Sequence, residues 1–287
     1  MMKGASPLRY PGGKSAMADL LIQIRKLNRL GHFAVAEPFA GGAGASLALL
    51  YLEETRKIFI NDADTAIYDF WWSLVNQPKR FLDYLSNTKV TMDEWQLQRD
   101  IYKNPDRRVS RVRRGFATFF LNRCNRSGII VKAGPIGGVN QSGKWKLDAR
   151  FNKTNLQRRC KKVSEYRDRI NVSCHDGKEF FDKVDNNTTM FFIDPPYFEK
   201  GPTLYLDCLK KGYHQELADR LRAIRDKAWV LTYDDCPEIR AMYQRWAYIR
   251  PYSLPYTAHR RRRGNEVLIV PKWMRLPDSQ ASTVLGW

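Results

Sequence analysis

The segment Asp194–Pro195–Pro196–Tyr197 follows directly after an apolar run, Met190–Ile193. Proline has no backbone N–H to give to a β ladder, so the run is expected to end there as a buried strand. Asp194 and Tyr197 would then lie at the carboxyl edge of a sheet, where open α/β sheets bind ligands. The segment therefore predicts a ligand-binding turn, with an acceptor beside an aromatic ring.

A glycine turn follows an earlier apolar run, in the sequence EPFAGGAG, and its glycines are Gly41, Gly42 and Gly44. Glycines at the start of a helix let a ligand approach the backbone closely. The spacing fits neither the dinucleotide fingerprint nor the P-loop. Asp62 ends the next strand, where an acid commonly binds ribose hydroxyls; the alternative is a helix N-cap, a role for which Asp64 competes. Together these residues predict a site for a nucleoside-type cofactor without a pyrophosphate.

Near the N-terminus, the segment RYPGGKS places two glycines between an aromatic residue and a lysine. Such a tight loop can present Tyr10 and Lys14 together, although alone it could be a capping turn.

Several short apolar runs must position these groups. Strands are expected at 33–39, 57–62, 170–174, 190–194, 229–234, 248–254 and 266–272. The first two alternate with helical patterns, which is typical of a parallel sheet covered by helices on both faces. Between them and the third strand, residues 76–169 are rich in charge, with helical stretches and a glycine-rich loop. The expected architecture is one α/β sheet interrupted by a basic, mostly helical insertion.

The positive charge is concentrated in that insertion. The chain has a formal net charge of +19, and residues 76–169 carry 23 Lys and Arg against 8 Asp and Glu. Residues 1–75 carry 8 against 7, so solubility alone does not account for the distribution. A polyanion partner does, because phosphate contacts release counterions. The alternative is a solvated basic face on a protein of another kind.

Other features of the composition narrow the class. No apolar stretch approaches the length of a membrane span, and the first residues lack the apolar core of a signal peptide. The five cysteines are scattered without a CxxC pair, which predicts reduced thiols in a cytoplasmic protein and no metal site.

The motifs RYPGGK, EPFAGGAG, NDAD and DPPY, in this order and with a basic insertion before the last, resemble the Dam-type (D12 class) adenine-N6 DNA methyltransferases. FFLNRCNRSGI, at 119–129, resembles that family's asparagine–arginine segment for DNA recognition. RRRRGNEVLIV resembles its final strand. The resemblance covers roughly residues 7–271. It implies a Rossmann-like methyltransferase sheet, a catalytic domain formed by 1–75 with 170–287, and a target-recognition domain at 76–169.

The resemblance also implies the reaction, in which a methyl group passes from S-adenosylmethionine to N6 of an adenine flipped out of duplex DNA. Asp194 and the carbonyl of Pro195 would accept from the amino group, and Tyr197 would stack on the base. Pro196 completes the catalytic tetrapeptide. The cofactor residues implied are Tyr10, Lys14, Glu37, Phe39, Gly41, Gly42, Gly44, Asp62 and Asp194.

For DNA, the expected phosphate contacts are Arg111, Arg113 and Arg114, although a plain solvated helix face is nearly as good an interpretation for each. The helical spacing of Phe116, Phe119 and Phe120 favours core packing. The remaining expected DNA-binding residues are Asn122, Arg123, Arg126, Arg260, Arg261, Arg262 and Arg263. A cognate restriction or defence component is a further candidate partner, and the oligomeric state is left open.

One departure concerns the target. Family members that methylate GATC commonly carry an aromatic residue and an arginine where this chain has Arg126 and Val131, so a GATC target is not predicted. Two further functions remain open, an RNA adenine-N6 methyltransferase and a non-catalytic DNA-binding regulator. The intact DPPY and Lys14 argue against the regulator. Cytosine-N4 methylation usually goes with serine at the first motif position, and Asp194 argues against it.

Overall fold

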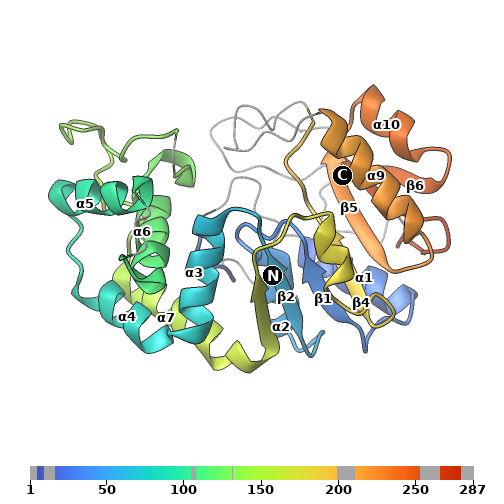
Figure 1. The fold of residues 1–287 in the computed structure, drawn as a ribbon, viewed down its shortest axis with the longest axis horizontal. Helices are drawn as coiled ribbons and strands as arrows, with labels where there is room; N and C mark the ends of the chain where they lie inside the picture. The colour runs from blue at the N-terminus through green and yellow to red at the C-terminus, as the bar shows by residue number, and fades with distance from the viewer. Residues whose placement is uncertain are drawn as a thin grey trace.

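The computed structural model describes residues 5–9, 17–104, 108–130, 132–198, 211–252 and 266–278. A seven-stranded sheet forms the centre of the molecule in the order β3-β2-β1-β4-β5-β7-β6 (Figure 1). The strands are β1 (Ala34–Glu37), β2 (Ile58–Asn61), β3 (Ile170–Ser173), β4 (Thr189–Ile193), β5 (Trp229–Asp234), β6 (Ala247–Tyr252) and β7 (Glu266–Pro271). All seven lie where the sequence predicts a strand.

The first five strands run parallel, with β1 between β2 and β4. β7 runs antiparallel between β5 and β6, and its first residue, Glu266, faces both Asp234 and Tyr252. The carboxyl ends of β1 to β5 therefore meet at one edge of the sheet. Every polar group predicted at a strand end lies at that edge.

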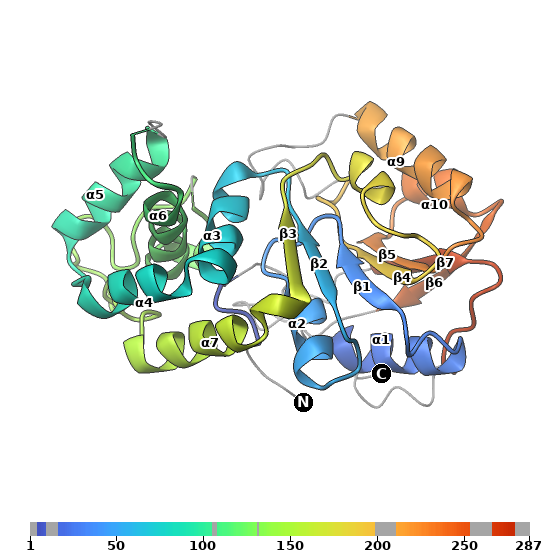
Figure 2. The ribbon, with the colours of Figure 1, turned by 60° about the horizontal axis from the view of Figure 1, so that its bottom comes forward.

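Helices cover both faces of the sheet (Figures 1 and 2). The helices in the same parts of the sequence as the strands are α1 (Ala18–Leu27), α2 (Gly44–Tyr51), α3 (Thr65–Asn76), α9 (Lys211–Ala223) and α10 (Pro237–Tyr243). Successive side chains of β4 belong to different clusters: Met190 and Phe192 pack with α1 and α2, whereas Phe191 and Ile193 pack with α9. This alternation explains why the whole strand is apolar, because both of its faces are buried.

In the part of the chain that the structure describes, four α-helices lie in the sequence between α3 and β3, where the sequence predicts a mostly helical insertion. They are α4 (Pro78–Asn87), α5 (Met92–Lys103), α6 (Arg111–Cys124) and α7 (Lys153–Glu165), and they form a lobe beside α3 (Figure 2). Phe116, Phe119 and Phe120 are fully buried, which confirms that this aromatic spacing marks core. Their cluster also contains Phe70 of α3 and Leu47 of α2. The lobe therefore shares one continuous apolar core with a face of the sheet.

Candidate active site

The DPPY turn begins where β4 ends, and β5 holds it. Asp194 is partly exposed, and its Oδ1 accepts a hydrogen bond of 2.5 Å from the Thr232 hydroxyl. Four residues later, the backbone N–H of Phe198 donates to Oδ1 of Asp234, at 3.1 Å. Tyr197 lies with its ring centroid 6.3 Å from that of Tyr233. The side chains of β5 thus contact both ends of the turn.

Two further carboxylates lie at the same edge, at the ends of β1 and β2. Oδ2 of Asp62 accepts from the Gly41 N–H at 2.8 Å, and Oδ1 accepts from the Asp64 N–H at 3.0 Å. Burial raises the pKa of Asp62 to about 7, with Asp64 as a smaller cause. Glu37 accepts from the Ser46 N–H at 2.7 Å, and burial raises its pKa to about 7. Asp194 adds to the shift of Glu37, which links this acid to the DPPY turn.

The N-cap alternative for Asp62 is resolved by its neighbour. Asp64 is the N-cap of α3, and its side chain accepts from the Ala66 N–H at 2.8 Å. Asp62 instead stabilises the glycine turn, because its carboxylate accepts a hydrogen bond from the Gly41 N–H.

The glycine turn has a left-handed backbone at two positions. Gly41 has a φ of 46°, a conformation that favours glycine, and Ala43, the N-cap of α2, has the same value. Gly44 is the first residue of α2. The Trp71 indole donates to the Gly41 carbonyl at 2.9 Å. The predicted turn therefore exists, and α3 fixes it from the side.

The loop after β3 belongs to the same edge, a contribution that the sequence analysis missed. The Asn61 amide donates to the carbonyls of Pro38 and His175, so it joins the ends of β1, β2 and β3. A Cβ on Gly177 would come within 2.2 Å of the Phe39 ring, so only glycine permits this contact. Asp176 accepts from the Tyr213 hydroxyl at 3.0 Å. The position of Asp176, two residues after the predicted strand 170–174, could have indicated from the sequence that this loop contributes to the site.

Six predicted site residues lie outside the described residues. They are Tyr10, Lys14, Arg260, Arg261, Arg262 and Arg263.

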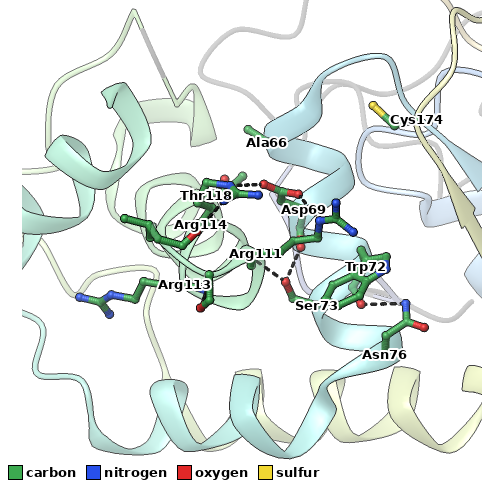
Figure 3. Close-up of polar contacts among 12 residues, drawn as sticks. Ala66, Asp69, Trp72, Ser73, Asn76, Arg111, Arg113, Arg114, Thr118 and Cys174 are labelled. Atoms are coloured by element: carbon green, nitrogen blue, oxygen red, sulfur yellow. Dashed lines mark hydrogen bonds and ion pairs between the residues drawn. The ribbon is translucent and has the colours of Figure 1, made fainter. Parts of the chain in front are cut away.

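Arg111 and Arg114, expected to face phosphates, instead contact α3. Nε of Arg114 lies 2.7 Å from Oδ2 of Asp69, and Nε of Arg111 lies 3.1 Å from Oδ1. The Arg111 guanidinium also lies over the rings of Tyr68 and Trp72. Figure 3 shows both arginines turned toward Asp69. Their assignment as phosphate contacts is not supported, because both are engaged in joining α6 to α3.

The third arginine of this helix takes another direction. Arg113 points away from Asp69 (Figure 3), and its guanidinium lies 5.2 Å from the centre of the Tyr84 ring. It lines a groove of about 720 Å³ between α4 and α5. Arg126, just after α6, is exposed. Among the described DNA-binding candidates, these two guanidinium groups have none of the ion pairs that engage Arg111 and Arg114.

Asn122 and Arg123 are also occupied within the protein. Asn122 is 1% exposed; its Oδ1 accepts from the Arg9 N–H and its Nδ2 donates to the Arg9 carbonyl, both at 2.7 Å. Arg123 donates from Nε to the Arg150 carbonyl, and burial lowers its pKa to about 10. Asn122 therefore ties the segment before RYPGGK to the insertion instead of facing DNA.

A family profile decides the identity. The profile described as D12 class N6 adenine-specific DNA methyltransferase matches residues 10–261. The chain belongs to this family. It is a site-specific DNA methyltransferase that acts on N6 of adenine, which confirms the predicted family, enzyme class and reaction. The family implies a DNA substrate and, in general terms, the use of S-adenosylmethionine.

Two individual proteins are similar to this D12 class member. Type II methyltransferase M.MjaIII of Methanocaldococcus jannaschii is 26% identical over 206 residues, which cover 66% of this chain and 68% of that protein. Among solved structures, the rRNA methyltransferase aviRa of Streptomyces viridochromogenes superposes with a TM-score of 0.37 at 14% identity. That superposition covers 94% of this chain and 90% of the other, but the score is too low to support a conclusion.

The described residues include no group of three or more His, Cys, Asp or Glu side chains that could hold a metal ion. None of their helices is long and apolar enough to cross a membrane.

Proposed function

We propose that the D12-type reaction takes place at the DPPY turn, with S-adenosylmethionine bound beside it at the ends of β1 and β2. The observation that carries the proposal is the grouping of Asp194, Glu37 and Asp62 at one edge of a parallel sheet. Among the described residues, Glu37 and Asp62 accept from backbone N–H groups, so they are held as hydrogen-bond acceptors.

In this proposal, the Asp194 carboxylate accepts one hydrogen bond from the adenine amino group, and the Pro195 carbonyl accepts the other. Drawing both N–H bonds out of the plane of the ring takes the N6 lone pair out of conjugation, which makes N6 a better nucleophile. Tyr197 stacks on the flipped base, and Pro196 stiffens the turn.

The residues present fit the cofactor. A half-buried carboxylate at a strand end suits ribose hydroxyls, a role for Asp62. The left-handed turn at Gly41 admits a close approach to its backbone. Glu37 braces the start of α2 through Ser46. Phe39, Gly42 and Gly44 are proposed to line the same cofactor site, and Tyr10 and Lys14 are proposed to contact the cofactor. When bound, S-adenosylmethionine supplies an electrophilic methyl group.

The insertion, residues 76–169, is proposed to recognise the target. Among its described residues, Arg113 and Arg126 are the candidates for DNA contact that the geometry favours, and Arg260 to Arg263 remain proposed as a second contact region. A cytoplasmic location and a cognate restriction or defence partner belong to the same proposal.

Transfer of labelled methyl groups to duplex DNA and to RNA, followed by nucleoside analysis, tests the reaction. N6-methyladenine in duplex DNA is expected; labelling of RNA alone would favour the RNA-directed alternative, and labelling of neither would favour the regulator.

The cofactor site is tested by calorimetric titration of Lys14→Ala and Asp62→Ala with S-adenosylmethionine. Each variant should bind more weakly, because each loses a charged or charge-assisted contact. Unchanged affinity in both would mean that the cofactor lies elsewhere.

A further inference from the structure

Two polar residues in the otherwise apolar strand β5 stand out. Thr232 is fully buried and Asp234 is 2% exposed. They are two residues apart on an extended strand, so their side chains point to the same side. Thr232 reaches Asp194, and Asp234 reaches the backbone N–H of Phe198, so together they span the turn 194–198.

The Thr232 hydroxyl has one clear acceptor. Its oxygen lies 2.5 Å from Oδ1 of Asp194 and 3.4 Å from the carbonyl oxygen of Ile193. A hydroxyl has a single proton, so the shorter contact to the carboxylate is the hydrogen bond. Bonds from a hydroxyl to a carboxylate are charge-assisted, short and directional.

Packing alone does not explain this threonine. Its neighbours along the strand, Leu231 and Tyr233, are fully buried, and its partner on β7 is Leu268. Valine has the same shape and avoids burying a hydroxyl, so a purely structural position would favour it. The acceptor at this position is the acid of the DPPY turn.

We propose that Thr232 is a positioning residue that sets the orientation of the Asp194 carboxylate toward the adenine amino group. The proposal deepens the proposed function and rests on it. A carboxylate turned about its Cβ–Cγ bond accepts in a different plane, and alignment of this kind matters most in the transition state. Asp234 fixes the far end of the turn through Phe198, so the motif cannot rotate as a unit.

The test is steady-state methylation kinetics on duplex DNA with Thr232→Val and Thr232→Ser. Loss of the hydroxyl should lower kcat by about 10- to 100-fold while KM for DNA and for S-adenosylmethionine stays within about two-fold. Serine keeps the donor, so Thr232→Ser should recover most of the lost turnover. Valine preserves the packing, so the unfolding midpoint should not fall.

Thr55→Val is the matched control. Thr55 is 1% exposed near the opposite edge of the same sheet, and its hydroxyl contacts the carbonyls of Phe33 and Lys57. This variant should keep kcat even if its stability falls. Equal kcat losses in Thr55→Val and Thr232→Val would show a structural effect and overturn the inference.

Asp194→Ala separates failure of the inference from failure of the proposed function. An inactive Asp194→Ala together with a fully active Thr232→Val would overturn the positioning role and leave the DPPY assignment intact. Near wild-type methylation by Asp194→Ala would overturn the assignment itself.

Discussion

Carboxylates are stabilised in opposite ways in two regions of this molecule. At the carboxyl edge of the sheet, Glu37 is buried and Asp62 is half-buried. Both accept hydrogen bonds from backbone N–H groups, and desolvation raises the pKa of both to about 7. At the junction of α3 and α6, Asp69 lies between the guanidinium groups of Arg111 and Arg114. The described donors to Glu37 and Asp62 are neutral backbone N–H groups, whereas the Asp69 carboxylate is neutralised by two arginines.

The difference separates a ligand site from a structural joint. An acid held by neutral donors retains acceptor capacity for hydroxyl or amino groups of a ligand. An acid between two arginines joins helices, and the arginines lose their freedom to bind phosphate. Asp69 lies outside residues 76–169, so the excess charge of the insertion is partly balanced by a residue that a segment count leaves out.

The strongest perturbation of the sheet edge should come from Asp194→Ala. We expect methyl transfer to fall by at least about 10³-fold, because an acceptor needed mainly in the transition state is lost. The protein should stay folded and bound to DNA, since Asp194 is partly exposed and contributes little to the core. Labelled methyl transfer and a duplex-binding titration measure the two effects.

At the α3–α6 junction, Asp69→Ala should lower the free energy of unfolding by about 3 kcal/mol, since it leaves two guanidinium groups without their acid. The figure is at the low end for a buried pair because the Arg111 side chain is 40% exposed. Urea denaturation measures it. Asp168→Ala, which removes an acid that is 91% exposed beside Arg167, is the control and should change stability by less than about 0.5 kcal/mol.

The raised pKa of Glu37 predicts a pH dependence of stability. Its pKa rises from 4.5 to about 7 on folding, so its favourable contribution is present below pH 4.5 and is lost as pH rises through 7. Relative to Glu37→Gln, the wild type should lose about 2–3 kcal/mol of stability between pH 5 and 8. Urea midpoints across that range test this; parallel profiles would contradict the buried-acid description.

The smallest effects should come from single charge reversals in the insertion. Arg113→Glu and Arg126→Glu should each weaken DNA binding a few-fold and reduce the salt slope by about one. If Arg126 contacts a base edge, it should also relax specificity at one position by about 1–3 kcal/mol. Reversing Arg111 and Arg114 cannot test DNA contact, because it would disrupt the joint with Asp69.

Arg222→Glu, an exposed reversal on α9 outside residues 76–169, is the control for non-specific charge effects. If the salt slope of DNA binding stays at the wild-type value in both Arg113→Glu and Arg126→Glu, the result would favour DNA contact at Arg260 to Arg263 instead.

The seven strands could be predicted from sequence because each is an apolar run that ends in a polar group or a turn. The position of β7 in the sheet could not be predicted, since nothing local to Glu266–Pro271 specifies an antiparallel place between β5 and β6. Asp62 and the glycine turn were predictable because strand ends and glycines carry local signals. The role of Thr232 could not be predicted, because it depends on contact with Asp194, and only the pairing of β4 with β5 brings the two residues together.

The roles of the basic residues were predicted least well. Charge density in α6 favours a phosphate-binding face, but the partner of Arg111 and Arg114 comes from α3, and only packing brings it there. Gly115 allows this approach, since a Cβ there would lie 2.3 Å from the Asp69 carbonyl oxygen. Asn122 is similar, because its partner Arg9 is distant in sequence.

The pairing of Ala34 on β1 with Thr189 on β4 sets the order in which the chain can fold. During synthesis, β1 and β2 emerge early, but the partner on the other side of β1 follows only after the whole helical lobe. The growing chain therefore exposes an unpaired strand edge for much of its translation, and closure of the sheet is a contact of long sequence separation. The helices of the lobe follow one another in the sequence and pack against α3, so the lobe is expected to collapse first and to give the sheet a formed surface to pack on. Mutations at the α3–α6 junction should then slow refolding, whereas those at the DPPY turn should leave its rate unchanged.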